Sequence, residues 1–121
     1  MILNEKLYTI TSEDIDSGIF KIRLKADCFI YSAHFPELPI TPGVCIIQLV
    51  KELAERQFGK TLMINSIKNA RFLKVMQPDD NEYVINIKLK KQECNILSVQ
   101  SVISDIDDNL YAKISLQTSA A

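Results

Sequence analysis

His34 is the only histidine of the 121-residue chain, and it opens a segment that is rich in proline. Residues 34–48 read His-Phe-Pro-Glu-Leu-Pro-Ile-Thr-Pro-Gly-Val-Cys-Ile-Ile-Gln. Imidazole is the side chain whose ordinary pKa best suits proton transfer near neutral pH, and the prolines leave the loop around it little freedom. Taken alone, a loop histidine is more often structural than catalytic. His34 is therefore a candidate base whose surroundings must supply the rest of the site.

The same segment leads into an apolar run whose start is suited to binding a carbonyl group. Gly43 lies where this run begins, and the first N–H groups of a helix have no partner inside the helix. Together with the helix dipole, such groups polarise a carbonyl or stabilise an oxyanion. Because glycine has no side chain, Gly43 also lets a ligand approach the backbone closely.

The apolar run predicts a helix over residues 43–58. Apolar residues fill most of its positions, and the polar ones gather mostly in its second half. A helix that is apolar on nearly all sides at its start must be enclosed by other elements. Thr41 is the expected N-cap, Pro42 suits the first helical position, and Gly59 is placed to end the helix.

Most of the remaining sequence has the period-two alternation of half-buried antiparallel strands. The alternation is regular over residues 20–25, 83–90 and 110–117, and weaker over residues 5–11, 62–76 and 94–104. The length argues for one domain over residues 1–121. The sequence thus predicts an α+β fold in which an antiparallel sheet of five to seven strands wraps around one buried helix.

The composition excludes several classes of protein. A net charge of −1, from 14 Lys and Arg against 15 Asp and Glu, excludes binding to nucleic acid through bulk positive charge. No apolar run reaches the roughly 20 residues of a membrane helix, and the first residues lack the apolar segment of a secretory signal. Cys28, Cys45 and Cys94 form no paired motif, so we expect reduced, mostly buried thiols in a cytoplasmic protein, with no disulfide and no metal site.

The order His-Phe-Pro-x-x-Pro-x-x-Pro-Gly-Val at the start of a buried helix resembles the (3R)-hydroxyacyl-[acyl-carrier-protein] dehydratases of fatty acid synthesis. Residues 70–80 look like the family's strand that ends in Pro-Gly-Asp, with Asp79 in place of glycine. Residues 107–113 look like its last hairpin, so the resemblance covers about residues 18–118. It implies the hot-dog fold, in which an antiparallel sheet wraps around one long helix.

The resemblance also implies a mechanism for the motif residues. His34 takes the role of the base that removes a proton from C2 of a 3-hydroxyacyl thioester, and the amide of Gly43 binds the thioester carbonyl. The matching positions Phe35, Pro42 and Val44 are expected to contact the substrate. The substrate arrives on the phosphopantetheine arm of an acyl carrier protein. This hydro-lyase reaction eliminates water to give the trans-2-enoyl product, so we expect no metal and no other cofactor.

The family's acid lies fourteen positions after the histidine and comes from the partner subunit, which implies a homodimer or a larger assembly. This chain has Gln48 at that position. Glutamine hydrogen-bonds a substrate hydroxyl but is no general acid, because its amide does not titrate near neutral pH. Glu52 stands one turn later, where the family often has glutamine, and is a candidate substitute acting through a water or a shifted acyl chain. The alternative is that Glu52 is a solvated or interface charge.

Three functions follow from these residues. His34 and the helix start favour a dehydratase acting on carrier-bound 3-hydroxyacyl chains, in fatty acid or related lipid or polyene synthesis. Gln48 favours instead a catalytically impaired subunit that binds acyl chains or carrier protein within a hot-dog heterodimer. The third function is an acyl thioesterase that uses Glu52 as its carboxylate, because thioesterases share this fold.

Overall fold

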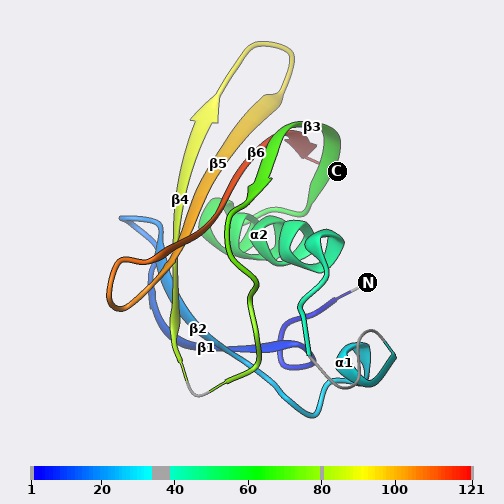
Figure 1. Cartoon of the computed structure of the whole chain (residues 1–121). Coiled ribbons are helices and arrows are strands. Elements are labelled where there is room, and N and C mark those ends of the chain that lie inside the picture. The colour runs from blue at the N-terminus through cyan, green and yellow to red at the C-terminus, as the bar shows by residue number, and fades with distance from the viewer. Residues whose placement is uncertain (1, 34–38, 80, 121) are drawn as a thin grey trace.

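The computed structural model describes residues 2–33, 39–79 and 81–120 of the chain. Within them, a six-stranded antiparallel sheet wraps around one long helix, α2 (Gly43–Phe58), as Figure 1 shows. The strands are β1 (Tyr8–Asp14), β2 (Ile19–Leu24), β3 (Leu62–Phe72), β4 (Tyr83–Lys91), β5 (Ile96–Asp105) and β6 (Leu110–Ala120). They lie in the order β1-β2-β4-β5-β6-β3, so β1 and β3 form the edges. The predicted sheet and the predicted helix at residues 43–58 are confirmed.

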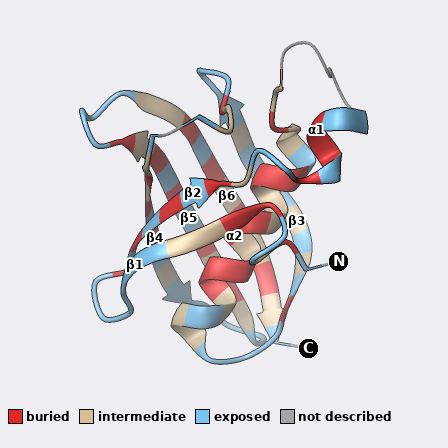
Figure 2. Cartoon of the chain, turned by 90° about the horizontal axis from the view of Figure 1, so that it is seen from below, coloured by how far each residue is buried: buried red, intermediate tan, exposed pale blue. Residues whose placement is uncertain are grey.

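One face of the sheet packs on α2, and the other is exposed (Figure 2). In β4, for example, Ile85 and Ile87 are fully buried, whereas Asn86 and Lys88, which alternate with them, are exposed. The strands with regular alternation lie where they were predicted. The weaker predictions differ from the structure in their bounds. The first strand, β1, begins at Tyr8, because residues 3–7 form a turn. The strand β3 ends at Phe72.

The helix α2 is buried along one side only. Leu49, Val50 and Leu53 are fully buried, and they contribute to the core that α2 shares with the sheet. Val44, however, is 70% exposed. The prediction that the start of the helix is enclosed on nearly all sides is therefore wrong, because no described element covers the side that carries Val44.

The ends of α2 are formed differently from each other. Gly59 ends the helix as predicted, in the left-handed conformation with φ of 82°, and its N–H donates to the carbonyl of Glu55 at 2.8 Å. At the other end the predicted N-cap Thr41 is wrong. The N-cap is Pro42, which makes no side-chain capping bond. The hydroxyl of Thr41 instead forms a hydrogen bond with the hydroxyl of Tyr31, at 2.9 Å. Tyr31 belongs to a short helix, α1 (Phe29–Ala33), which was not predicted.

All three cysteines are free thiols. Cys28 and Cys45 are buried as predicted, whereas Cys94 is exposed, and burial raises the pKa of the Cys45 thiol. No three His, Cys, Asp or Glu side chains of residues 2–33, 39–79 and 81–120 gather in a way that would hold a metal ion. Within the same residues, no helix is long and apolar enough to cross a membrane.

Substitution of two glycines that have positive φ tests how closely the start of β2 approaches β4. A Cβ on Gly18 would lie 2.2 Å from the carbonyl oxygen of Ile87, whereas a Cβ on Gly59 would meet no atom within 4 Å. We expect Gly59→Ala to lower the free energy of unfolding by about 1–2 kcal/mol, the cost of a left-handed residue. Gly18→Ala adds an overpacking cost of about 1–3 kcal/mol. If urea denaturation gave equal losses in the free energy of unfolding for the two variants, the close approach of Gly18 to Ile87 would be contradicted.

Candidate active site

A hollow of about 310 Å³ opens at the start of α2. Its lining comes from the helix start and from the chain after β3: Ile40, Thr41, Gly43, Ile46, Phe72, Leu73, Lys74, Val75 and Met76. Gly43 lies against one wall, because a Cβ there would come within 3.0 Å of the Phe72 ring. The helix start therefore faces a largely apolar hollow, in which the ring of Phe72 packs close against Gly43.

The wall formed by residues 73–77 is held in place by β6 and β4. The carbonyl of Tyr111 accepts hydrogen bonds from the N–H groups of Leu73 and Lys74, at 2.8 and 3.2 Å. The hydroxyl of Tyr83 contacts both the N–H and the carbonyl of Gln77, each at 3.1 Å. Burial raises the pKa of Tyr83 to about 12, further above neutral pH than the pKa of an ordinary tyrosine.

The predicted base His34 and the predicted contact residue Phe35 lie outside the described residues. The chain on either side of them is tied together by the pair of hydroxyls of Tyr31 and Thr41. The Thr41 N–H also donates to the carbonyl of Met76 at 2.9 Å, and burial raises the pKa of Tyr31 to about 12. Both ends of the segment that carries His34 are thus anchored beside the hollow.

The other predicted binding residues all lie at the start of α2. Gly43 lines the hollow, and Pro42 precedes it as an N-cap without a capping side chain. The first N–H groups of α2 therefore receive no bond from a cap and face outward along the helix axis. Val44 is at the helix start too, but its exposed side chain is not among those that line the hollow.

Gln48 and Glu52 lie elsewhere on α2, and neither lines the hollow. Their side chains contact each other, with Gln48 Nε2 donating to Glu52 Oε2 at 2.9 Å. Glu52 is only 8% exposed, so its interpretation as a solvated charge is wrong. The structure of a single chain thus brings Gln48 and Glu52 together, and it keeps both apart from the hollow at Gly43.

Three further donors surround Glu52, and the sequence analysis missed all of them. The N–H groups of Leu3 and Asn4 donate to its two carboxylate oxygens at 2.8 and 2.9 Å. The hydroxyl of Tyr8 donates to Oε1 at 2.9 Å. Burial, together with the negative charge of Glu52, holds the pKa of Tyr8 well above its ordinary value. Almost every residue has a backbone N–H group, so the sequence does not show which of them bind Glu52. Among the three donors, only the Tyr8 hydroxyl could have been considered from the sequence.

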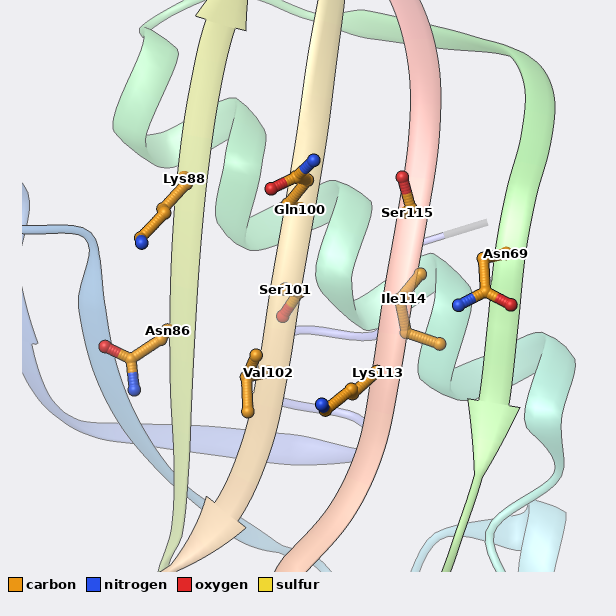
Figure 3. Close-up of a pocket in the computed structure, with 9 residues that line it drawn as sticks. All are labelled: Asn69, Asn86, Lys88, Gln100, Ser101, Val102, Lys113, Ile114 and Ser115. Atoms are coloured by element: carbon orange, nitrogen blue, oxygen red, sulfur yellow. The ribbon is translucent and has the colours of Figure 1, made fainter.

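A second hollow, of about 240 Å³, lies on the exposed face of the sheet. Figure 3 shows its lining on β3, β4, β5 and β6 with α2 behind the strands. Its charged groups are Lys88 and Lys113, among amide and hydroxyl side chains. None of the predicted site residues that the structure describes lines it, and the sheet separates it from the helix (Figure 3). We therefore place the candidate active site at the start of α2.

The family model for ApeI-like dehydratases, described as ApeI dehydratase, matches residues 10–112. The chain belongs to this dehydratase family. Two relatives are 3-hydroxyacyl-[acyl-carrier-protein] dehydratases FabZ. The one from Lactiplantibacillus plantarum is 32% identical over 84 residues, which are 62% of this chain and 56% of that protein. The one from Rhizobium etli is 31% identical over 102 residues, which are 78% and 64% of the two chains. The chain therefore spans little more than half the length of these relatives.

Solved structures agree with this family in their fold. A chain of the dehydratase heterocomplex ApeI:P from Xenorhabdus doucetiae superposes with a TM-score of 0.67 at 20% identity, over 84% of this chain and 85% of that chain. A hypothetical thioesterase with coenzyme A from Streptococcus pneumoniae superposes with a TM-score of 0.66 at 14% identity, over 94% and 85%. These likenesses confirm the hot-dog fold that the motif implied.

The buried carboxylate of Glu52 gives a stability prediction. Glu52→Ala leaves two backbone N–H groups and the Tyr8 hydroxyl without their acceptor, so we expect a loss of about 3–5 kcal/mol in the free energy of unfolding. Glu55→Ala is the matched control, because Glu55 on the same helix accepts one backbone N–H, that of Leu62 at 2.8 Å. Helix propensity favours alanine in both variants. Equal losses in urea denaturation would show that Glu52 does not hold the N-terminal residues.

Proposed function

We propose that the protein eliminates water from 3-hydroxyacyl thioesters that are carried by an acyl carrier protein. The observation that carries this proposal is the uncapped start of α2, where Gly43 borders an apolar hollow inside the part of the chain that the dehydratase family matches. The names of the Lactiplantibacillus plantarum and Rhizobium etli relatives support the substrate class. We expect the reaction in the cytoplasm, where the three free thiols stay reduced.

The proposed chemistry divides between the helix start and His34. The amide of Gly43 binds the thioester carbonyl, and the helix dipole stabilises the negative charge that develops on its oxygen. This makes the C2 proton more acidic, and His34 removes it as general base. The apolar hollow suits the acyl chain or the pantetheine arm next to the thioester. The electrons of the C2–H bond form the C2–C3 double bond as the C3–O bond breaks, and the 3-hydroxyl leaves as water with the proton that His34 took up. The elimination uses no metal and no cofactor beyond the carrier's arm.

We further propose that a second copy of the chain covers the β3 edge. Large apolar side chains are exposed along β3 and beside the hollow: Met63, Ile67, Phe72, Val75 and Val44. A soluble monomer rarely exposes so many large apolar side chains next to an edge strand. Gln48 does not line the hollow of its own chain. In the proposed dimer, Gln48 contributes to the active site of the partner subunit.

A heterodimer is the second candidate arrangement. The Xenorhabdus doucetiae neighbour is described as a dehydratase heterocomplex, and this chain has Gln48 where the resemblance implies an acid. In a heterodimer, His34 of this chain works with an acid from a related subunit. The homodimer then has little activity, and adding the related subunit restores it.

The first prediction concerns turnover. Wild-type protein should convert a 3-hydroxyacyl-carrier-protein to the trans-2-enoyl product, followed by mass spectrometry of the carrier. His34→Ala should lower this rate by about 10²–10⁴, the contribution of a general base. Cys94→Ala is the control, because this exposed residue lies in the turn between β4 and β5. Release of free acid without enoyl product would favour the thioesterase instead, and equal rates for wild type and His34→Ala would reject His34 as the base.

The second prediction concerns assembly. Light scattering at micromolar concentration should give at least twice the 13.7 kDa of one chain. Ile67→Lys places a charge on the β3 edge and should shift the protein to monomers. Ile106→Lys is the control, because Ile106 is also exposed but lies in the turn between β5 and β6, away from β3. A monomeric wild type, or dissociation by both substitutions alike, would contradict pairing through β3.

A further inference from the structure

The second hollow, on the exposed face of the sheet, has a volume of about 240 Å³ and is formed by β3, β4, β5 and β6. The pairing of these strands lines it with two neighbouring rows of outward-facing residues: Asn69, Ser115, Gln100 and Lys88 in one row, and Lys113, Val102 and Asn86 in the other. Figure 3 shows these side chains on strands that have α2 behind them. The register of the sheet therefore fixes which side chains meet in this hollow.

The four strands that form this hollow carry an excess of positive charge. Together they contain six Lys and Arg residues but only one acid, Asp105, whereas the whole chain has 14 basic and 15 acidic residues. Asp105 is buried at the end of β5, where it accepts hydrogen bonds from the N–H groups of Asp107 and Asn109. A solvated sheet face usually mixes both signs of charge, so that opposite charges pair across strands. This face is positive in a chain of net charge −1, and it therefore attracts anions.

Two of these cations lie directly opposite each other across a strand pair. Arg71 on β3 is in register with Lys113 on β6, and both side chains are exposed. Like charges at opposed positions destabilise a sheet. Among residues 2–33, 39–79 and 81–120, the ion pairs are those of α2 with itself and with Glu13, so none of them offsets this repulsion. An anion bound beside Lys113 would offset it.

The uncharged side chains of the hollow are suited to hydroxyl groups. Asn69, Asn86 and Gln100 each present a carboxamide, which both donates and accepts hydrogen bonds, as a hydroxyl does. Within the described part of the chain, these three side chains have no hydrogen-bond partner. The hollow is smaller than the roughly 300–1,000 Å³ of typical ligand pockets, which indicates a small ligand.

We propose that this hollow is a binding site for a small phosphate ester that carries hydroxyl groups. The ammonium groups of Lys88 and Lys113 bind the phosphate, and the carboxamides bind the hydroxyls. Lys88 and Lys113 lie on β4 and β6, on either side of β5. Two strand spacings amount to about 10 Å, which two lysine side chains can span to reach one phosphate. The proposal does not depend on dehydration, because the sheet separates this hollow from the start of α2 (Figure 3).

Binding of glycerol 3-phosphate to the full chain tests the site directly. In nitrogen-15 spectra, this probe should shift the backbone amides around Lys88, Gln100 and Lys113, with a Kd below about 1 mM. Inorganic phosphate should bind about fivefold to tenfold more weakly because it has no hydroxyl-bearing carbon chain, and glycerol should cause no shift. Shifts scattered over the whole surface, or no shift at about ten times that limiting Kd, would overturn the proposal.

Substitutions that remove one charge distinguish a site from general attraction. Lys88→Gln and Lys113→Gln should each raise the Kd of glycerol 3-phosphate about 10-fold to 100-fold, the usual effect of losing a charged hydrogen bond. Lys90→Gln is the matched control, because Lys90 is two residues from Lys88 on β4 and exposed, but does not line the hollow. It should change the Kd less than about twofold, since it removes only screened, long-range attraction. Equal weakening by all three substitutions would overturn the proposal.

The part assigned to the carboxamides has its own test. Gln100→Ala should bring the Kd of glycerol 3-phosphate close to that of inorganic phosphate, and an unchanged preference would show that the amides do not bind the hydroxyls. The probe should also raise the Tm of wild type and of Lys90→Gln, but not of the variant with Lys88→Gln and Lys113→Gln together. Sedimentation with phosphatidylglycerol vesicles, without any response to the free probe, would indicate a membrane surface as the ligand and would overturn the proposal.

Discussion

The burial of α2 is the constraint on which the rest of the molecule depends. Fully buried side chains such as Leu49 and Leu53 need apolar partners along one whole side of the helix. The sheet supplies them because every second residue of its strands points to the same face. A sheet that follows the helix must curve around it, and its other face is then exposed and polar. The positions of Gly43, Gln48 and Glu52 along α2 follow from this packing arrangement.

The same arrangement leaves the start of α2 open. Pro42 at the N-cap has no group that bonds to the first amides, and Val44 points away from the core. The chain after β3 runs past this end, where Tyr83 and Tyr111 hold it through backbone hydrogen bonds. A helix end that is fixed in place but not capped is suited to polarise a carbonyl group, because its amides remain directed at the ligand.

Glu52 shows how one buried charge specifies the path of a distant segment. A carboxylate removed from water must find donors, and Leu3, Asn4 and Tyr8 supply three of them from 44 to 49 residues away in sequence. This ties the N-terminal residues to the middle of α2. Gln48, one turn earlier on α2, donates a hydrogen bond to the same carboxylate. A single side chain thereby links the N-terminal segment to Gln48, at the position where the resemblance implies an acid.

The sequence by itself determined the elements whose signals are local. Period-two alternation identified β2, β4 and β6, and the Pro-Gly start with Gly59 at the end identified α2, because each signal lies within the element that it describes. The motif from His34 to Val44 likewise identified the family, since its residue types stand in an order that is specific to it. Only the tertiary structure decided that Thr41 pairs with Tyr31 and that Glu52 is buried among donors. The donors to Glu52 are distant in sequence and include two backbone N–H groups, which every residue except proline possesses and which therefore leave no trace in the sequence.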